Sequence, residues 1–372
     1  MRDAYIIIAS QEYETANHKD LWTELANVIM GQVIIVNIAA DQVVSRLKGK
    51  KKRILEAKQG KRIITNNLMV VRPMFFVRPE ILPNFLQKTC AKSFWRCIKK
   101  AYPQINESNI KIIVYDPCWV RILHGSQDNM RIAYYLYDEL RYRSDNGVID
   151  KKSYRKDEYA CQHCDLLLTM SGKLAESRIE YGKKTVIVGN GASVKSSSRL
   201  LKKMENSVAF VGNFRDWIDL DLLEDLIKKR HDKKFIFIGP IQPNMEAAMW
   251  SLLNKNLNTF YYGVATKEDI WDIYRMIECV IVPYKTNEFM SATRPIKIVE
   301  AVLAGTPVVT IPMNGYEQTR FIRYATDVES FSRQIDFVCK NGVGEDDDAY
   351  KAFVKENTWK NKALLIVEAM TD

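Results

Sequence analysis

Short apolar runs of strand length alternate with segments of helical length along the chain, and this alternation restricts the fold more than any other feature. Strand–helix alternation is typical of a parallel sheet with helices on both faces. The sequence therefore predicts an α/β fold, including a long helix over 82–101 and a last helix over 349–370. The expected strands are 4–10, 33–37, 68–72, 111–115, 131–137, 165–170, 185–188, 208–211, 235–239, 259–262, 279–282 and 308–311.

The alternation is interrupted once, at Gly189-Asn190-Gly191, and a polar stretch follows before it resumes. Glycine-rich, polar segments of this kind mark domain boundaries. The 372 residues are also enough for two domains of ordinary size. We therefore expect one Rossmann-like domain at 1–190, a second at 191–348, and a C-terminal helix at 349–372.

The second domain contains a strand–loop–helix–strand unit over 281–312. Pro295 suits the first position of its helix, because a proline there lacks only an N–H that would be unpaired anyway. Arg294 precedes this helix, Lys297 lies in its first turn, and Glu300 lies three residues later on the same face. A helix N-terminus with Arg and Lys suits a diphosphate, and the carboxylate suits a sugar diol. A surface helix with a Lys–Glu pair is the alternative.

The stretch from Pro295 to 309 resembles the P-x-K-x-x-E-x-x-A-x-G-x-P-V-V signature of bacterial GT-B glycosyltransferases of group 1, including the teichuronic-acid and xanthan glucuronosyltransferase types. The resemblance implies two Rossmann-like domains facing a cleft, with the last helix crossing back to the N-terminal domain. It implies that the N-terminal domain binds the acceptor and the C-terminal domain binds a nucleotide sugar, with UDP as the expected nucleotide. Lys297 would contact the donor phosphate and Glu300 the ribose.

Three further turns follow strands of the second domain, and the resemblance places them at the donor. Gly212, Asn213 and Arg215 would face the diphosphate, Gly239 would lie near the base, and Tyr262 would lie beside it. Each could equally be a plain turn.

The loop over 284–294 should cover the sugar, which makes Glu288 a candidate sugar contact. Retaining relatives carry a Glu eight positions before the motif Glu, where this chain has Ala292. The departure favours an inverting reaction. A second departure is Ser193, which replaces the acid of an N-G-V-D-like turn in relatives.

An inverting transferase needs a base that accepts the proton of the acceptor hydroxyl. Asp138 follows an expected strand of the first domain, where open α/β sheets bind ligands, and relatives of the xanthan type keep a base Asp in that domain. Glu139 is the second candidate and His18, at the start of the first helix, is the third. Structural capping is the alternative for the two acids, and a plain surface role for His18.

The net charge is +10, with basic clusters at 48–53, 99–100, 151–156 and 202–203. Such charge suits nucleic acid, an anionic membrane surface or an acidic substrate. No zinc finger, RRM or helix-turn-helix signature is present, so we expect no nucleic-acid partner. A membrane-surface enzyme with a lipid-linked, phosphate-bearing acceptor accounts for the charge, and a solvated basic face does so as well.

The chain has no run of roughly 20 apolar residues, no signal-peptide shape, and seven cysteines without framework spacing. These features predict a cytoplasmic protein, with peripheral association at the inner face of the cell membrane as one option. The resemblance implies that no metal is needed, and no phosphate loop of the G-x-x-x-x-G-K-[ST] type occurs.

The sequence thus predicts a metal-independent glycosyltransferase (hexosyltransferase type) that moves a sugar from a nucleotide-diphosphate donor to a saccharide or lipid-linked saccharide in bacterial surface polysaccharide synthesis. The alternative is a catalytically degenerate GT-B protein that binds a nucleotide sugar or a partner. The departures at Ala292 and Ser193 motivate that alternative.

Overall fold

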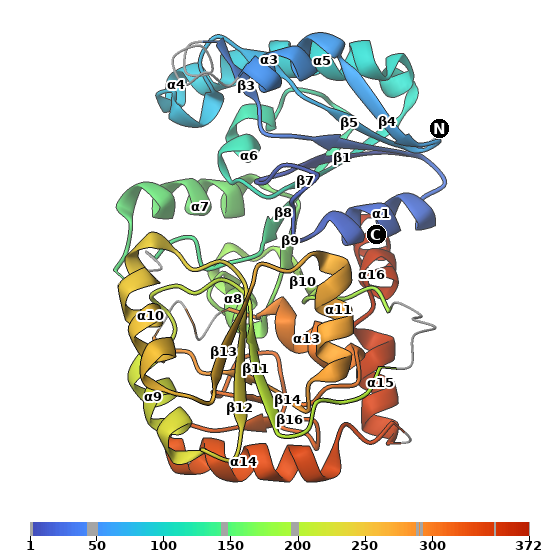
Figure 1. Cartoon of the computed structure of the whole chain (residues 1–372). Helices are drawn as coiled ribbons and strands as arrows, with labels where there is room; N and C mark the ends of the chain where they lie inside the picture. The colour runs from blue at the N-terminus through green and yellow to red at the C-terminus, as the bar shows by residue number, and fades with distance from the viewer. Residues whose placement is uncertain are drawn as a thin grey trace. The chain divides into compact units, whose positions relative to one another are not determined.

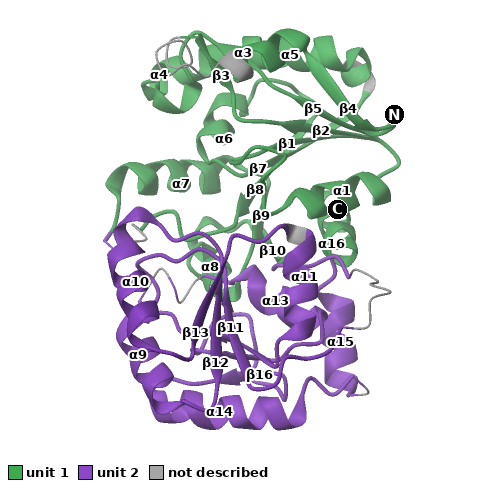
Figure 2. Cartoon of the chain, in the orientation of Figure 1, with its two compact units in different colours: residues 1–142, 149–188, 359–372 green, residues 143–148, 189–358 purple. Residues whose placement is uncertain are grey.

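The computed structural model describes residues 3–42, 51–142, 148–194, 201–287, 290, 293–345 and 347–371. The chain divides into two compact units (Figure 2). Unit 1 comprises Met1–Tyr142, Ile149–Val188 and Trp359–Asp372, and unit 2 comprises Arg143–Val148 and Gly189–Thr358. The segment that returns to unit 1 therefore begins at Trp359, ten residues later than the 349–372 segment expected from the sequence. No helix in the described part of the chain is long and apolar enough to cross a membrane.

Unit 1 is built on an eight-stranded sheet with the order β10-β9-β8-β7-β1-β2-β5-β4. All neighbouring strands are parallel except β4, which pairs antiparallel with β5. The central strands are runs of Ile and Val that are buried on both faces, as parallel sheets require. Strand β4 was missed because all of its residues are exposed and two are basic. The strands are β1 (Asp3–Ile8), β2 (Gln32–Val36), β4 (Lys61–Thr65), β5 (Leu68–Val71), β7 (Asn109–Val114), β8 (Met130–Leu136), β9 (Leu166–Thr169) and β10 (Lys184–Ile187), and a separate pair is β3 (Ala40–Asp41) with β6 (Met74–Phe75).

Helices cover both faces of this sheet. In Figure 1, α3 and α5 lie over one face of the strands while α1 and α16 lie side by side at the other. Alternate residues of β1 join the core with Phe94 and Ile98 of α5 on the first face. The packing of α16 against α1 confirms that the last helix returns to the N-terminal domain. The helices are α1 (Lys19–Val28), α3 (Lys51–Gln59), η1 (Pro79–Ile81), α4 (Asn84–Gln87), η2 (Lys88–Cys90), α5 (Ala91–Ala101), η3 (Pro103–Glu107), α6 (Cys118–Leu123), α7 (Lys151–His163), α8 (Gly172–Glu176), η4 (Ile179–Tyr181) and α16 (Trp359–Thr371).

Two of the expected long helices are broken. The 82–101 helix is divided into α4, the 3-10 turn η2, and α5. The last helix is divided at Asn357 into α15 and α16, because the carbonyl of Asn357 accepts a hydrogen bond from the N–H of Ala192 (2.9 Å). That bond takes the backbone out of the helical ladder at this residue.

Unit 2 is built on a six-stranded, fully parallel sheet with the order β13-β12-β11-β14-β15-β16. Its strands are β11 (Ser207–Val211), β12 (Lys234–Ile238), β13 (Thr259–Gly263), β14 (Cys279–Val282), β15 (Val308–Thr310) and β16 (Ile322–Tyr324). Its helices are α9 (Leu220–Lys229), η5 (Pro243–Met245), α10 (Glu246–Lys255), α11 (Lys267–Met276), α13 (Ile296–Leu303), α14 (Val328–Asn341) and α15 (Asp348–Glu356). Helix α13 begins at Ile296, one residue later than expected, so Pro295 has extended backbone and occupies the N-cap position. Lys297 still lies in the first turn.

Candidate functional site

The strand order of unit 2 changes direction between β11 and β14. The chain runs from β11 outward through β12 to β13, then returns to β14 on the other side of β11 and continues to β15. Open α/β sheets bind ligands at such switch points, outside the carboxyl ends of the strands. Gly212 follows β11 and Tyr284 follows β14 shortly after its end, so these two residues mark the switch point.

The ammonium group of Lys297 lies at this switch point. Its Nζ is 4.0 Å from the ring centroid of Phe210 and 5.2 Å from that of Tyr284, and the residue is only 9% exposed. Burial lowers the pKa of Lys297 to about 7, and the charge of Glu300 offsets this only in part. Among the residues that the structure describes, no carboxylate forms an ion pair with it. Within the described ranges, aromatic rings are therefore the closest partners of this buried amine, and such a setting favours an anionic ligand.

Two glycines allow this close packing. Gly212 has φ +136°, and a Cβ built on it would lie 2.5 Å from Nζ of Lys297. Gly239, which follows β12, has φ +131°, and its Cβ would lie 2.2 Å from the carbonyl oxygen of Gly212. Both backbone conformations are ones that L side chains rarely adopt. The turns after β11 and β12 thus bring bare backbone next to the lysine.

Arg294 is held by its own neighbours in unit 2. Its carbonyl accepts a hydrogen bond from Nδ2 of Asn190, and its Nη2 lies 3.5 Å from Oδ1 of Asn357. Its guanidinium lies 4.7 Å from the ring centroid of Tyr316, whose hydroxyl donates to the carbonyl of Pro295 (2.9 Å). The Nε atom is buried and has no hydrogen-bond partner among the described residues. Arg294 therefore retains an unused donor beside the start of α13.

The other residues predicted to bind the donor differ in burial and in contacts. Glu300 is partly buried, and the hydroxyl of Tyr274 lies 3.5 Å from its Oε2. Arg215 stacks at 5.0 Å on Trp217, and Asn213 is exposed. Glu288 and Ala292 lie outside the described residues.

The side chain of Tyr262 is 58% exposed on β13, whereas the hydroxyl of its neighbour Tyr261 donates to the carbonyl of Gly239 (2.9 Å). Successive side chains of a strand point to opposite faces. The resemblance implies that the stretch at Tyr262 contacts the base through backbone groups, and that expectation stays a prediction. Sequence reasoning missed Phe210, Tyr284 and Tyr316, and the only signal was that aromatic residues recur at strand ends and beside the motif.

In unit 1 the strand order changes direction between β1 and β7, and Asp138 follows the next strand, β8. Burial of its carboxyl group raises the pKa of Asp138 to about 7. No hydrogen bond or ion pair joins that carboxyl group to another described residue. A carboxyl group that changes charge near neutral pH can act as a base or an acid.

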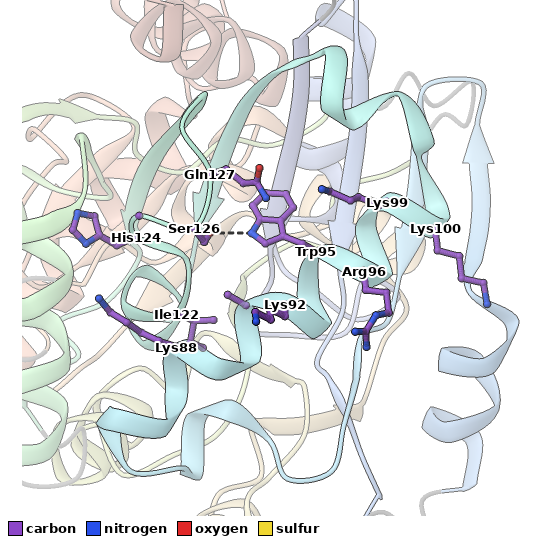
Figure 3. Close-up of a pocket in the computed structure, with 12 residues that line it drawn as sticks. Lys88, Lys92, Trp95, Arg96, Lys99, Lys100, Ile122, His124, Ser126 and Gln127 are labelled. Atoms are coloured by element: carbon purple, nitrogen blue, oxygen red, sulfur yellow. Dashed lines mark hydrogen bonds between the residues drawn. The ribbon is translucent and has the colours of Figure 1, made fainter.

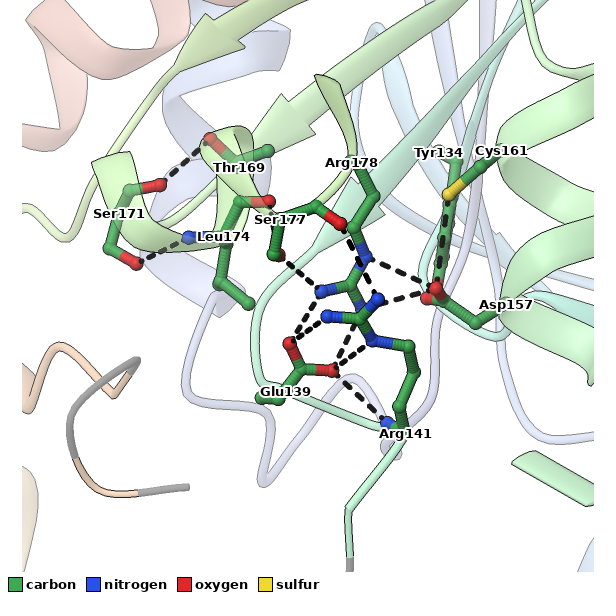
Figure 4. Close-up of polar contacts among 10 residues, drawn as sticks. All are labelled: Tyr134, Glu139, Arg141, Asp157, Cys161, Thr169, Ser171, Leu174, Ser177 and Arg178. Carbon is green, nitrogen blue, oxygen red and sulfur yellow. Dashed lines mark hydrogen bonds and ion pairs between the residues drawn. The ribbon is translucent and has the colours of Figure 1, made fainter. Parts of the chain in front are cut away.

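Glu139 has the opposite environment, which Figure 4 shows. Its carboxylate accepts from Nη2 of Arg178 and from Nε of Arg141, both at 2.9 Å. Burial alone would raise the pKa of Glu139, but these hydrogen bonds hold it at about 2. Arg178 is fully buried and also donates from Nε to Asp157 (3.1 Å). Glu139 therefore has a structural role in these ion pairs, and we keep Asp138 as the preferred candidate for the base.

His18 occupies the N-cap position of α1 without a capping hydrogen bond from its side chain, and aromatic rings lie close to it. Its ring centroid lies 5.5 Å from those of Tyr115 and Tyr135 and 5.6 Å from that of Trp359. This setting gives His18 a packing role between α1 and α16. No group of three or more His, Cys, Asp or Glu residues that could hold a metal ion occurs within the described ranges.

A family model described as Glycosyl transferases group 1 matches residues 192–357. Among curated proteins, the chain is 24% identical over 207 residues to TuaH of Bacillus subtilis (strain 168), described as a teichuronic acid biosynthesis glycosyltransferase. The match covers 53% of this chain and 51% of that protein, so the chain spans about half the length of this curated relative.

Two similar solved structures are sucrose-phosphate synthase from Thermosynechococcus elongatus and HepE of Anabaena in complex with UDP. The first has a TM-score of 0.71 at 13% identity and covers 99% of this chain and 98% of that one. The second has a TM-score of 0.65 at 13% identity and covers 99% of both chains. These likenesses confirm the fold that the motif implied, GT-B with two Rossmann-like domains.

Proposed function

We propose that this chain, whose residues 192–357 match the group 1 glycosyltransferase model and whose fold is GT-B, transfers a sugar from a UDP-sugar to a saccharide or lipid-linked saccharide in bacterial surface polysaccharide synthesis. The similarity to a teichuronic acid glycosyltransferase and to a UDP-bound structure supports the acceptor class and the nucleotide. Unit 2 would bind the donor and unit 1 the acceptor.

The observation that carries this proposal is the buried ammonium of Lys297 at the switch point of unit 2. Its pKa of about 7 shows that the site without a ligand only partly stabilises the charge. A diphosphate would supply the missing anion and would raise that pKa, so donor binding should take up a proton near neutral pH. In the reaction, the ammonium would stabilise the charge that develops on the departing UDP.

The remaining roles follow from this placement. Glu300, one turn along α13, would accept from the ribose hydroxyls, and Arg294 would offer its unused Nε to the diphosphate. The acceptor oxygen would attack the anomeric carbon as the bond to UDP breaks. Asp138 would accept the proton of the acceptor hydroxyl, which corresponds to inversion.

The experiment that tests this function is a thermal-shift comparison with UDP, GDP, ADP and CMP. A ligand that binds only the folded state raises the melting temperature. We expect UDP to give the largest shift and Lys297→Met to lose it. Absence of a shift with any nucleotide would overturn the proposal. A UDP shift without transfer or hydrolysis of any UDP-sugar would favour the degenerate, binding-only alternative.

Replacing Gly212 should impair donor binding specifically. We expect Gly212→Ala to weaken UDP binding about tenfold, because its Cβ would lie 2.5 Å from Nζ of Lys297 and would displace the ammonium. Titration calorimetry measures the affinity. Gly342→Ala is the matched control, since Gly342 also has positive φ (+57°) and no atom within 4 Å of the built Cβ. Equal UDP affinity in the two variants would contradict the prediction.

Replacing Asp138 should abolish transfer and leave donor binding intact. We expect Asp138→Asn to reduce kcat by roughly 10²- to 10⁴-fold, the range for loss of a general base, with an unchanged UDP shift. In the wild type at saturating donor, kcat should rise with pH through about 7, as Asp138 ionises. An unchanged kcat in the variant would exclude Asp138 as the base.

A further inference from the structure

An apolar loop on unit 1 is exposed between two groups of basic side chains. Ile81, Phe85 and Leu86 are 51%, 78% and 39% exposed, respectively, and lie within six residues of one another. We name this loop together with the two basic groups beside it the α4 surface. The first basic group comprises Lys88, Lys92, Arg96, Lys99 and Lys100, and the second comprises Arg121, Lys151, Lys152, Arg155 and Lys156.

Prolines and hydrogen bonds fix the backbone of this loop, so the structure itself keeps its apolar side chains exposed. Pro79 begins η1 and Pro83 precedes α4, which fixes the backbone at both positions. The buried side chain of Gln87 donates to the carbonyl of Leu82 (3.0 Å). Trp119 donates from Nε1 to Glu80 (3.1 Å). The scaffold is therefore anchored while Phe85 faces solvent.

The first basic group lines a hollow of about 880 Å³ beside α5. Figure 3 shows its side chains arrayed along η2 and α5. Lys88, Lys92, Arg96 and Lys100 recur every four residues, which spans about 18 Å of helix. No ion pair joins any of these cations to a described residue, and no acidic residue lines this hollow.

The second basic group lies on the other side of the loop, around a hollow of about 530 Å³ that Ile81 also lines. Among the described residues that line this hollow, the one acidic residue is Glu80, and burial raises its pKa above the usual value. Lys151, Lys152 and Arg155 are exposed and have no ion-pair partner among the described residues. The two basic groups contain ten cations, and the described residues that line the two hollows include one carboxyl group, the buried one of Glu80.

We propose that the α4 surface docks this protein on an anionic lipid bilayer, with Phe85 and Leu86 entering the headgroup region and the two basic groups contacting lipid phosphates. Apolar side chains flanked by Lys and Arg bind bilayers in this way. A soluble polyanion would account for the cations but would leave the exposed apolar side chains unexplained. Binding to a bilayer does not depend on the proposed function, but its role does. If that function holds, docking would bring unit 1 to a lipid-linked acceptor.

The test is co-sedimentation of the full chain with vesicles of phosphatidylcholine alone and of phosphatidylcholine mixed with phosphatidylglycerol. We expect binding to the anionic vesicles only, falling as ionic strength rises. Lys88→Gln/Lys92→Gln should weaken it about tenfold or more. Phe85→Ser/Leu86→Ser should weaken it about tenfold or more, from the loss of buried apolar area.

Matched controls lie on unit 2. Leu257 is 99% exposed, so Leu257→Ser removes an exposed apolar side chain, and Lys255→Gln/Lys340→Gln removes two exposed charges. Both controls should bind vesicles as the wild type does. Equal binding by the α4-surface variants and the controls would overturn the proposal.

A second outcome would also overturn it. If Phe85→Ser/Leu86→Ser binds normally while soluble polyphosphate displaces the protein from vesicles, the surface is a polyanion site. The UDP thermal shift, measured on the same variants, should not change. If the wild type showed no UDP shift, the proposed function would be rejected, and vesicle binding would stand as an independent result.

Discussion

Lys297→Met should reduce kcat/KM for the UDP-sugar by roughly 10²- to 10³-fold, the range for removal of one group that stabilises developing charge in a transition state. The ammonium is the only described cation packed against Gly212, Phe210 and Tyr284 at the switch point of unit 2. Methionine has a similar shape and no charge, so the variant removes the electrostatic interaction and keeps the packing. Initial rates at varied donor concentration measure the effect.

The control is Lys233→Met. Lys233 is also buried, at 7% exposure, but it precedes β12 and lies at the opposite end of that strand from Gly239. Its Nζ lies 3.4 Å from Oδ1 of Asn206. We expect this variant to keep wild-type kcat/KM. If the two variants lost activity equally, the loss would come from the fold and the phosphate role of Lys297 would be rejected.

The thermal stability of Lys297→Met gives a second, independent readout. The pKa of Lys297 is about 7 in the folded state and 10.5 in the reference state. Between these values the unfolded chain binds more protons, so this lysine makes stability rise with pH. The gain in melting temperature of the variant over the wild type should therefore be largest below about pH 7 and should shrink as the pH approaches 10.5.

The sheet architecture was predictable because it depends on local hydrophobic patterning. The central strands are Ile- and Val-rich runs, and β14 has the limits expected from the sequence. Strand β4 could not be found in this way, because its residues are exposed and its only signal is pairing with β5. The break at Asn357 likewise depends on a hydrogen bond to Ala192, which is remote in sequence.

The candidate site was predictable where its residues follow one another along the chain. Lys297 and Glu300 share a face of α13 by spacing, and Gly212 and Gly239 stand directly after strands. The cage around Lys297 was not predictable, since Phe210 and Tyr284 approach it from two other strands. The sequence ranked Asp138 before Glu139, but the reason became visible only in the structure, where two arginines bind Glu139 and no described residue pairs with Asp138.

Arg178→Met should reduce the free energy of unfolding by about 3–5 kcal/mol, the cost of leaving a buried ion pair without one partner. Arg178 is fully buried and serves both Glu139 and Asp157, which are themselves buried (Figure 4). Because both carboxylates are buried, water cannot replace the hydrogen bonds that they would lose with Arg178. Urea denaturation of the two proteins measures the difference.

Arg141→Met is the matched control. Arg141 also binds Glu139 but is more exposed, and its loss leaves Arg178 in place, so we expect a loss of only about 1 kcal/mol. Equal losses in the two variants would show that the arginines share the charge and that burial of Arg178 is not decisive.

The pH dependence of this difference identifies its electrostatic origin. Glu139 has a folded-state pKa of about 2 against a reference value of 4.5, so it contributes stability above about pH 4.5 that is lost as the pH falls toward 2. Without Arg178 the pKa of Glu139 would rise, because only Arg141 would remain to lower it, and that contribution to stability would be smaller. The stability gap between wild type and Arg178→Met should therefore narrow below about pH 4.5. A gap that stays constant with pH would instead indicate lost packing around the arginine side chain.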